Sequence, residues 1–187
     1  ANKNSLKKYF LRLFLFACIS QLPFRLFYSI YTEGFILNIF FTLLVGLFSI
    51  FLYDKITHSI FPLFKNEKIN LYFKQLLGFL VVILLGTFAQ ICHFDYGFFG
   101  IAIIFLFYLF RNDRLAMVIS FITTCILKYG IPSILYGFSS WYIGLSIFTI
   151  LPIIFICFYN KKQGKKVKYL LYLFYPVHLF LLYLLFR

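Results

Sequence analysis

The apolar run at residues 169–186 contains a histidine, His178, in the sequence YPVH. Tyr175 lies one helical turn before it, so both side chains occupy one face of a predicted helix. An imidazole surrounded by hydrocarbon is costly and usually faces the interior of a helix bundle, where it marks a site. It could accept a proton from a substrate, and Pro176 would loosen the helix and make room for a ligand. A histidine bonded to a neighbouring helix would give the same pattern.

A second set of reactive residues follows the third long apolar stretch, in the sequence HFDYGFFG at residues 93–100. Asp95 could bind a substrate amine or orient an imidazole, and His93 and Tyr96 would be substrate contacts beside it. The alternative is structural, because aspartate is a common N-cap and a helix is expected to start at residue 97.

Polar residues also interrupt the first two apolar stretches. Gln21 and Arg25 flank Pro23, whose ring frees a backbone carbonyl that must find another partner. They would line a polar cavity, or Arg25 would extend to the interface from the end of a helix. Asn38 and Thr42 are four residues apart on one face. We expect interhelical hydrogen bonds from both, with a substrate contact of Asn38 as the alternative.

The composition requires a membrane protein. The 187 residues are 63% hydrophobic and 24% aromatic, against about 45–50% apolar residues in typical soluble domains. Repeated long apolar stretches without period-2 alternation indicate a bundle of transmembrane helices and exclude a barrel. A formal net charge of +13 could indicate nucleic-acid binding. We attribute it to lysines that flank the spans and expect no nucleic-acid partner.

A span needs about 20 apolar residues, which predicts seven spans in one all-α transmembrane domain over residues 1–187. The two longest cytoplasmic loops are expected at 54–70, part of it an amphipathic segment on the membrane face, and at 160–168. The 115–132 span is interrupted by Thr123 and Thr124. The seven spans are 9–29, 35–53, 71–92, 97–110, 115–132, 139–159 and 169–186.

The basic residues predict the orientation. With the N-terminus in the cytoplasm and the C-terminus outside, fifteen of the 18 basic residues fall on the cytoplasmic side. Only Arg25, Lys128 and Arg187 are left on the other side. This asymmetry follows the positive-inside rule.

The motifs that usually identify an enzyme are absent. The sequence has no nucleotide-binding glycine loop and no Gly-x-Ser-x-Gly, and its three histidines lack metal-ligand spacing, so we expect no metal. The four cysteines are single residues within apolar runs, and we expect them to pack as small side chains. Three classes stay open on these grounds: a membrane-embedded transferase, a small transporter, and a structural subunit of a membrane complex.

Several blocks of the sequence resemble the TraX family of small bacterial inner-membrane proteins, and they follow the family order along nearly the whole chain. They are KKYFLR (7–12), SQLPF (20–24), LNIFFTLLVG (37–46), DYGFFG (95–100), FYLFR (107–111), LP (151–152), YN (159–160) with the basic loop after it, and YPVHL (175–179).

The resemblance implies a polytopic acyltransferase of the bacterial cytoplasmic membrane. Its donor would be acetyl-CoA, and its acceptor a conjugative pilin N-terminus or a surface glycan. His178 would then be the base, Tyr175 and Asp95 would assist it, and Lys161, Lys162 and Lys165 would attract the phosphates of acetyl-CoA. The family usually opens with further helices that carry an Asp-His pair, and we expect this chain to start downstream of them. An oligomer or a larger membrane complex is compatible with the sequence.

Overall fold

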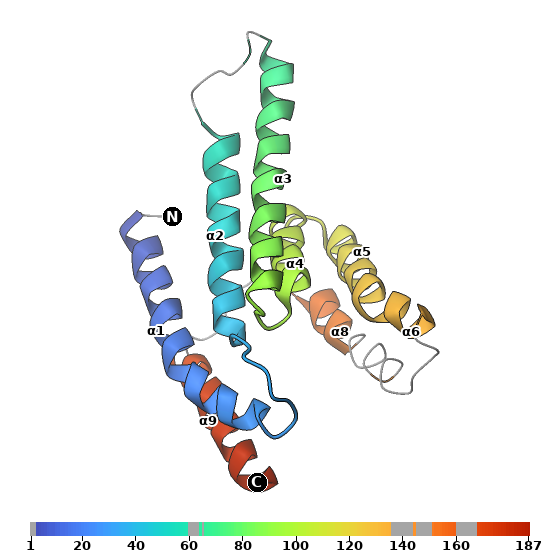
Figure 1. Cartoon of the computed structure of the whole chain (residues 1–187). Coiled ribbons are helices and arrows are strands. Elements are labelled where there is room, and N and C mark those ends of the chain that lie inside the picture. Colours follow the sequence, from blue (N-terminus) through green and yellow to red (C-terminus); the bar gives the residue numbers. More distant parts are fainter. Residues whose placement is uncertain (1–2, 60–63, 65, 136–143, 145–150, 160–167) are drawn as a thin grey trace. The chain divides into compact units, whose positions relative to one another are not determined.

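The computed structural model describes residues 3–59, 64, 66–135, 144, 151–159 and 168–187, and these residues are almost entirely helical (Figure 1). No β-strand occurs in these ranges, which confirms the all-α class. The helices are α1 (Lys3–Tyr28), α2 (Ile39–Thr57), α3 (Glu67–Ile91), α4 (Gly97–Leu109), α5 (Arg114–Cys125), the π-helix η1 (Ile126–Gly130), α6 (Ile131–Leu135), α8 (Leu151–Phe158) and α9 (Lys168–Phe186).

The chain forms two compact units. The first contains residues 1–101 and 165–187, and the second contains residues 102–164. In the first unit α2 packs against both α1 and α3, and α9, from the far end of the sequence, packs along α1. In the second unit α5 packs against α8.

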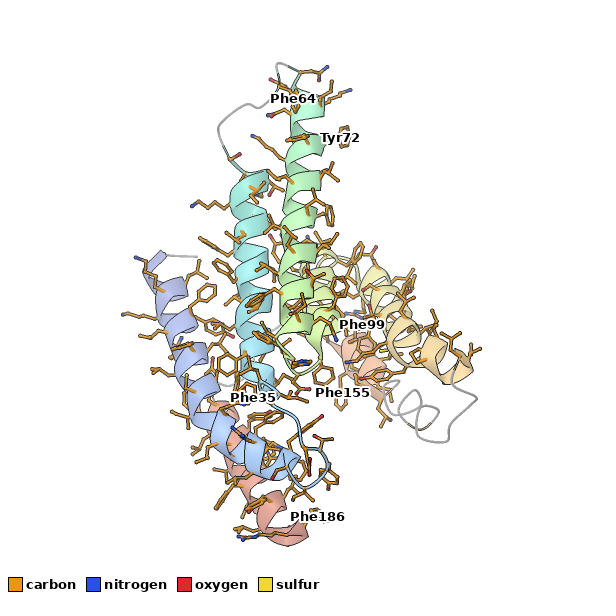
Figure 2. All side chains as sticks on the ribbon, in the orientation of Figure 1. Phe35, Phe64, Tyr72, Phe99, Phe155 and Phe186 are labelled. Carbon is orange, nitrogen blue, oxygen red and sulfur yellow. The ribbon has the colours of Figure 1, made fainter. Side chains whose placement is uncertain are left out.

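Four helical stretches are long and apolar enough to cross a membrane, and the protein is a membrane protein. Large apolar side chains of these helices, such as that of Tyr72 in α3, are exposed (Figure 2), as expected for helices that face lipid. Helix α4 is shorter. Most of the predicted 139–159 span lies outside the described residues, so seven spans and the orientation stay predictions. The four stretches are Leu6–Tyr28, Ile39–Thr57, Glu67–Ile91 and Arg114–Leu135.

Side-chain caps set the helix boundaries that the apolar pattern misplaced. Asn38 accepts a hydrogen bond from the Phe40 amide, so α2 begins at Ile39 and extends to Thr57. The Asn66 side chain accepts hydrogen bonds from backbone amides of the residues that follow and caps α3. Helix α3 therefore begins before residue 71, where the predicted span begins. An N-cap side chain satisfies amides that have no partner in the first turn. The connection between the two helices is therefore shorter than the predicted 54–70 loop.

The predicted interruption at Thr123 and Thr124 does not break the helix. Thr124 is buried and donates to the Ser120 carbonyl at 2.7 Å. The regular α-helix changes immediately afterwards into the π-helix η1. Helical structure continues to Leu135.

A buried amide pair joins α1 to the start of α2. The Asn38 side chain is fully buried and donates to the Ala17 carbonyl at 2.7 Å and to Gln21 Oε1 at 2.9 Å. Gln21 also accepts from the Asn38 backbone amide and donates to the Ile36 carbonyl at 2.7 Å. The predicted role of Asn38 in holding helices together is confirmed.

The apolar core beside this pair lies between α1, α2 and α9. Leu13 and Ala17 of α1 and Phe40 of α2 are buried. Tyr172 and Tyr175 of α9 pack against them. The last helix of the sequence is thereby held against the first two.

Hydrogen bonds from the segment before α2 hold the turn between α3 and α4 in place. The Leu37 amide donates to the His93 carbonyl at 3.0 Å, and the Asp95 amide donates to the Leu37 carbonyl at 2.8 Å. Thr42 Oγ1 donates to the Asp95 carbonyl at 2.5 Å. Thr42 thus makes an interhelical contact, as predicted, and the backbone of Asp95 is fixed on two sides.

We predict that Gly100→Ala destabilises this turn. A Cβ atom at Gly100 would lie 2.6 Å from the Thr42 methyl carbon, so Thr42 and its bond to Asp95 would have to move. Overpacking of this kind costs about 1–3 kcal/mol. Thermal unfolding of the purified protein in detergent should show a lower midpoint. Gly34→Ala is the control, because nothing lies within 4 Å of its Cβ position, and an equal loss in both variants would contradict the prediction.

We also predict that Asn38→Ala destabilises the junction of α1 and α2, because it removes an N-cap and the two buried hydrogen bonds that the side-chain amide donates to the Ala17 carbonyl and to Gln21 Oε1. The expected loss is roughly 1–3 kcal/mol. The same unfolding assay measures it. Asn66→Ala is the matched control, since it removes an exposed cap only, and a smaller effect of Asn38→Ala than of Asn66→Ala would contradict the prediction.

Candidate functional site

Tyr175 lies where α9 meets the beginning of α2. Its ring packs edge-on against Phe40 at a centroid distance of 5.1 Å. The backbone amide of Ile39, the first residue of α2, lies near its hydroxyl group. That amide belongs to the helix end, where N–H groups have no partner within the helix. The hydroxyl proton could be donated to another group.

Asp95 and Tyr96 come from the α3–α4 turn and approach the same place. The charge of Asp95 acts on the hydroxyl groups of both Tyr96 and Tyr175. Loss of hydration, followed by the neighbouring Asp95 charge, raises the pKa of Tyr96. Tyr96 is 48% exposed, so a ligand could reach its side chain.

The backbone of this turn is strained. His93 and Tyr96 have φ angles of 52° and 64°, and Gly97 has a φ angle of 48°. Only glycine adopts this left-handed region freely, and it is unusual for an aromatic residue. Such strain persists only where surrounding contacts enforce it, and it is often found at functional sites. Here Leu37 and Thr42 supply those contacts.

His178 lies one turn beyond Tyr175 on α9, and the centroids of their rings are 5.6 Å apart. Its Nδ1 lies 2.9 Å from the Phe174 carbonyl in the same helix. A carbonyl can only accept a hydrogen bond, so Nδ1 carries the proton in the neutral ring and Nε2 keeps its lone pair. The ring also stacks on Phe174 at 4.8 Å. This arrangement leaves Nε2 able to accept a proton.

The other predicted substrate contacts have different roles in the structure. The side-chain donors and acceptors of Gln21 and Asn38 are used in the amide pair. The Arg25 guanidinium is exposed and lies 5.6 Å from the Phe35 ring centroid, which agrees with a helix end at an interface. The His93 side chain is exposed, while its carbonyl holds the turn. Lys161, Lys162 and Lys165 lie outside the described residues.

Tyr175, His178, Asp95 and Tyr96 therefore form the candidate site, which we call the Tyr–His site. It combines a base, a hydroxyl donor and a carboxylate. General base catalysis and stabilisation of a developing oxyanion need the first two. The carboxylate could bind an amine. Within the described ranges no group of three metal-binding side chains occurs.

The second unit contains a pocket that the sequence analysis missed. It has a volume of about 570 Å³ and combines apolar side chains with the cation of Arg111. Arg111 donates to the Tyr108 carbonyl at 2.7 Å and lies 4.4 Å from the centroid of the Tyr108 ring. Arg114 donates to the Tyr159 carbonyl at 2.9 Å, which ties the α4–α5 turn to the end of α8. The lining residues are Phe107, Arg111, Asn112, Met117, Phe155, Ile156 and Tyr159.

The sequence does not predict this pocket because its parts lie far apart along the chain. The bond from Arg114 to Tyr159 spans 45 residues of sequence, and no local pattern predicts such a contact.

Comparison with known proteins gives one match. The family described as TraX protein matches residues 1–186. Neither a curated protein nor a solved structure gives a significant match. Because the family match covers essentially the whole of this helical membrane protein, the chain belongs to the TraX family.

Proposed function

We propose that the protein is an acyltransferase of the bacterial cytoplasmic membrane, which transfers an acetyl group from acetyl-CoA to the N-terminus of a conjugative pilin or to another cell-surface acceptor. The observation that carries this proposal is the Tyr–His site. It combines an imidazole with an available Nε2 and a neighbouring tyrosine whose hydroxyl lies near the Ile39 amide. Membership of the TraX family supports the same reaction class.

In this mechanism His178 Nε2 removes a proton from the acceptor amine as the amine attacks the thioester carbonyl. Tyr175 donates its hydroxyl proton in a hydrogen bond to the oxyanion that develops on the carbonyl oxygen. The carbon–sulfur bond breaks as the carbon–nitrogen bond is completed. The imidazolium returns its proton to the departing thiolate. Asp95 would hold the acceptor amine before it loses its proton.

Acetyl-CoA, the proposed acetyl donor, needs a binding site for its phosphate groups. In the predicted orientation Arg111, which lines the pocket of the second unit, falls on the cytoplasmic side, where acetyl-CoA is found. A guanidinium is well suited to phosphate because it offers several N–H donors in one plane. The aromatic rings of the pocket provide apolar surface for the rest of the donor, and Lys161, Lys162 and Lys165 would add positive charge nearby.

We predict that His178→Ala lowers acetyl transfer by about 10²–10⁴-fold, the usual contribution of a general base. Intact-mass analysis of pilin and other surface substrates, in cells with each variant, measures the product as a gain of one acetyl group. His58→Ala is the matched control. The His58 ring also bonds a carbonyl four residues earlier in its own helix, but it lies at the exposed end of α2.

Full transfer by His178→Ala would exclude the proposed base. Absence of product from the wild-type protein, present in the membrane, would favour a structural subunit or a transporter. Flux of a substrate without covalent change would distinguish the transporter from the subunit.

We predict that Arg111→Gln raises the KM for acetyl-CoA about tenfold with little change in kcat, because a charge-assisted hydrogen bond to phosphate is lost. Initial rates in reconstituted vesicles measure both constants. Lys68→Gln is the control, since this exposed lysine lies in the first turn of α3 and outside the pocket. An equal rise in both variants would show that general positive charge, and not the pocket, attracts the donor.

A further inference from the structure

A second pocket, which we call the Phe groove, lies between α1 and α2 in the first unit. It has a volume of about 340 Å³ and is lined by Leu6, Lys7, Phe10, Phe48 and Phe51. Phe48 packs edge-on against Phe10 and stacks on Phe51, each at 6.4 Å between ring centroids. The rings form the walls, and Lys7 is the one charged residue of the lining.

The groove starts at the level of the lipid head groups. Lys7 is the second residue of the candidate span Leu6–Tyr28, so it lies at the membrane surface whichever side that surface faces. Phe10 is three residues after Lys7, about 4.5 Å deeper at a rise of 1.5 Å per residue. Phe51 lies six residues before the end of α2, about 9 Å from that end. The groove therefore extends from the head-group level into the hydrocarbon.

The charge at the shallow end is positive. Lys7 and Lys8 both lie in the first turns of α1. On α2, Lys55 is four residues after Phe51 and shares its helix face, with Asp54 as the acidic neighbour. Three cations and one carboxylate leave a net positive end, which attracts an anionic head group.

We infer that the Phe groove binds an anionic phospholipid, with one acyl chain between the phenylalanine rings and the head-group phosphate at the Lys7 ammonium. A hydrocarbon chain fits the apolar walls and depth of the groove. A negative head group fits the single cation at its mouth. The site is separate from the Tyr–His site and does not depend on the proposed acetyl transfer.

Lipid binding to the delipidated full chain in detergent tests this inference. Native mass spectrometry with phosphatidylglycerol and phosphatidylcholine of the same acyl chains gives the two affinities. The wild-type protein should prefer the anionic lipid. Lys7→Gln should reduce that preference about fivefold, the effect of one cation near a lipid surface. Lys8→Gln is the matched control, because Lys8 is adjacent but does not line the groove.

A second pair of variants tests the acyl-chain contact. Phe10→Ala should weaken binding of both lipids about tenfold through loss of apolar contact. Phe14→Ala should leave binding unchanged, because Phe14 is an exposed residue of the same helix outside the groove. Equal binding of the two lipids by the wild-type protein would overturn the inference. An equal loss in Lys7→Gln and Lys8→Gln would do so too, because it would show diffuse attraction to the surface.

Discussion

The buried amide pair of Gln21 and Asn38 is the interaction on which the first unit depends. In an apolar environment each amide must find partners within the protein, because leaving one unpaired is costly. The pair finds them at Ala17, at Ile36 and at the first turn of α2. This fixes where α2 begins and how it meets α1. The position of the Ile39 amide, which lies near the Tyr175 hydroxyl, follows from that junction.

The same junction explains how a strained turn is kept in place. Leu37 immediately precedes Asn38, and its backbone bonds hold both ends of the segment from His93 to Asp95. Thr42, one turn into α2, fixes the Asp95 carbonyl. The Leu37 backbone and the Thr42 side chain therefore position the turn that carries Asp95 and Tyr96.

The sequence predicted the helical class, the membrane setting and the packing roles of Asn38 and Thr42, because these depend on composition and helix periodicity. It placed helix ends less well at Asn38 and Asn66, where a single capping side chain overrides the apolar pattern. We predicted a substrate contact for Gln21 from its polarity. In the structure its side chain is bonded to the Asn38 side chain and to the Ile36 carbonyl. The pocket at Arg111 depends on a contact with Tyr159, and residues so distant in sequence leave no local signal.

The bond between His178 and its own helix does not exclude a role in chemistry. His58 makes the same type of bond, and that bond only determines which ring nitrogen carries the proton. The difference between the two lies in their neighbours. His58 contacts Thr57 at an exposed helix end, whereas His178 lies beside Tyr175, whose hydroxyl is influenced by the Ile39 amide and by the charge of Asp95. The surroundings, and not the imidazole alone, make His178 the candidate base.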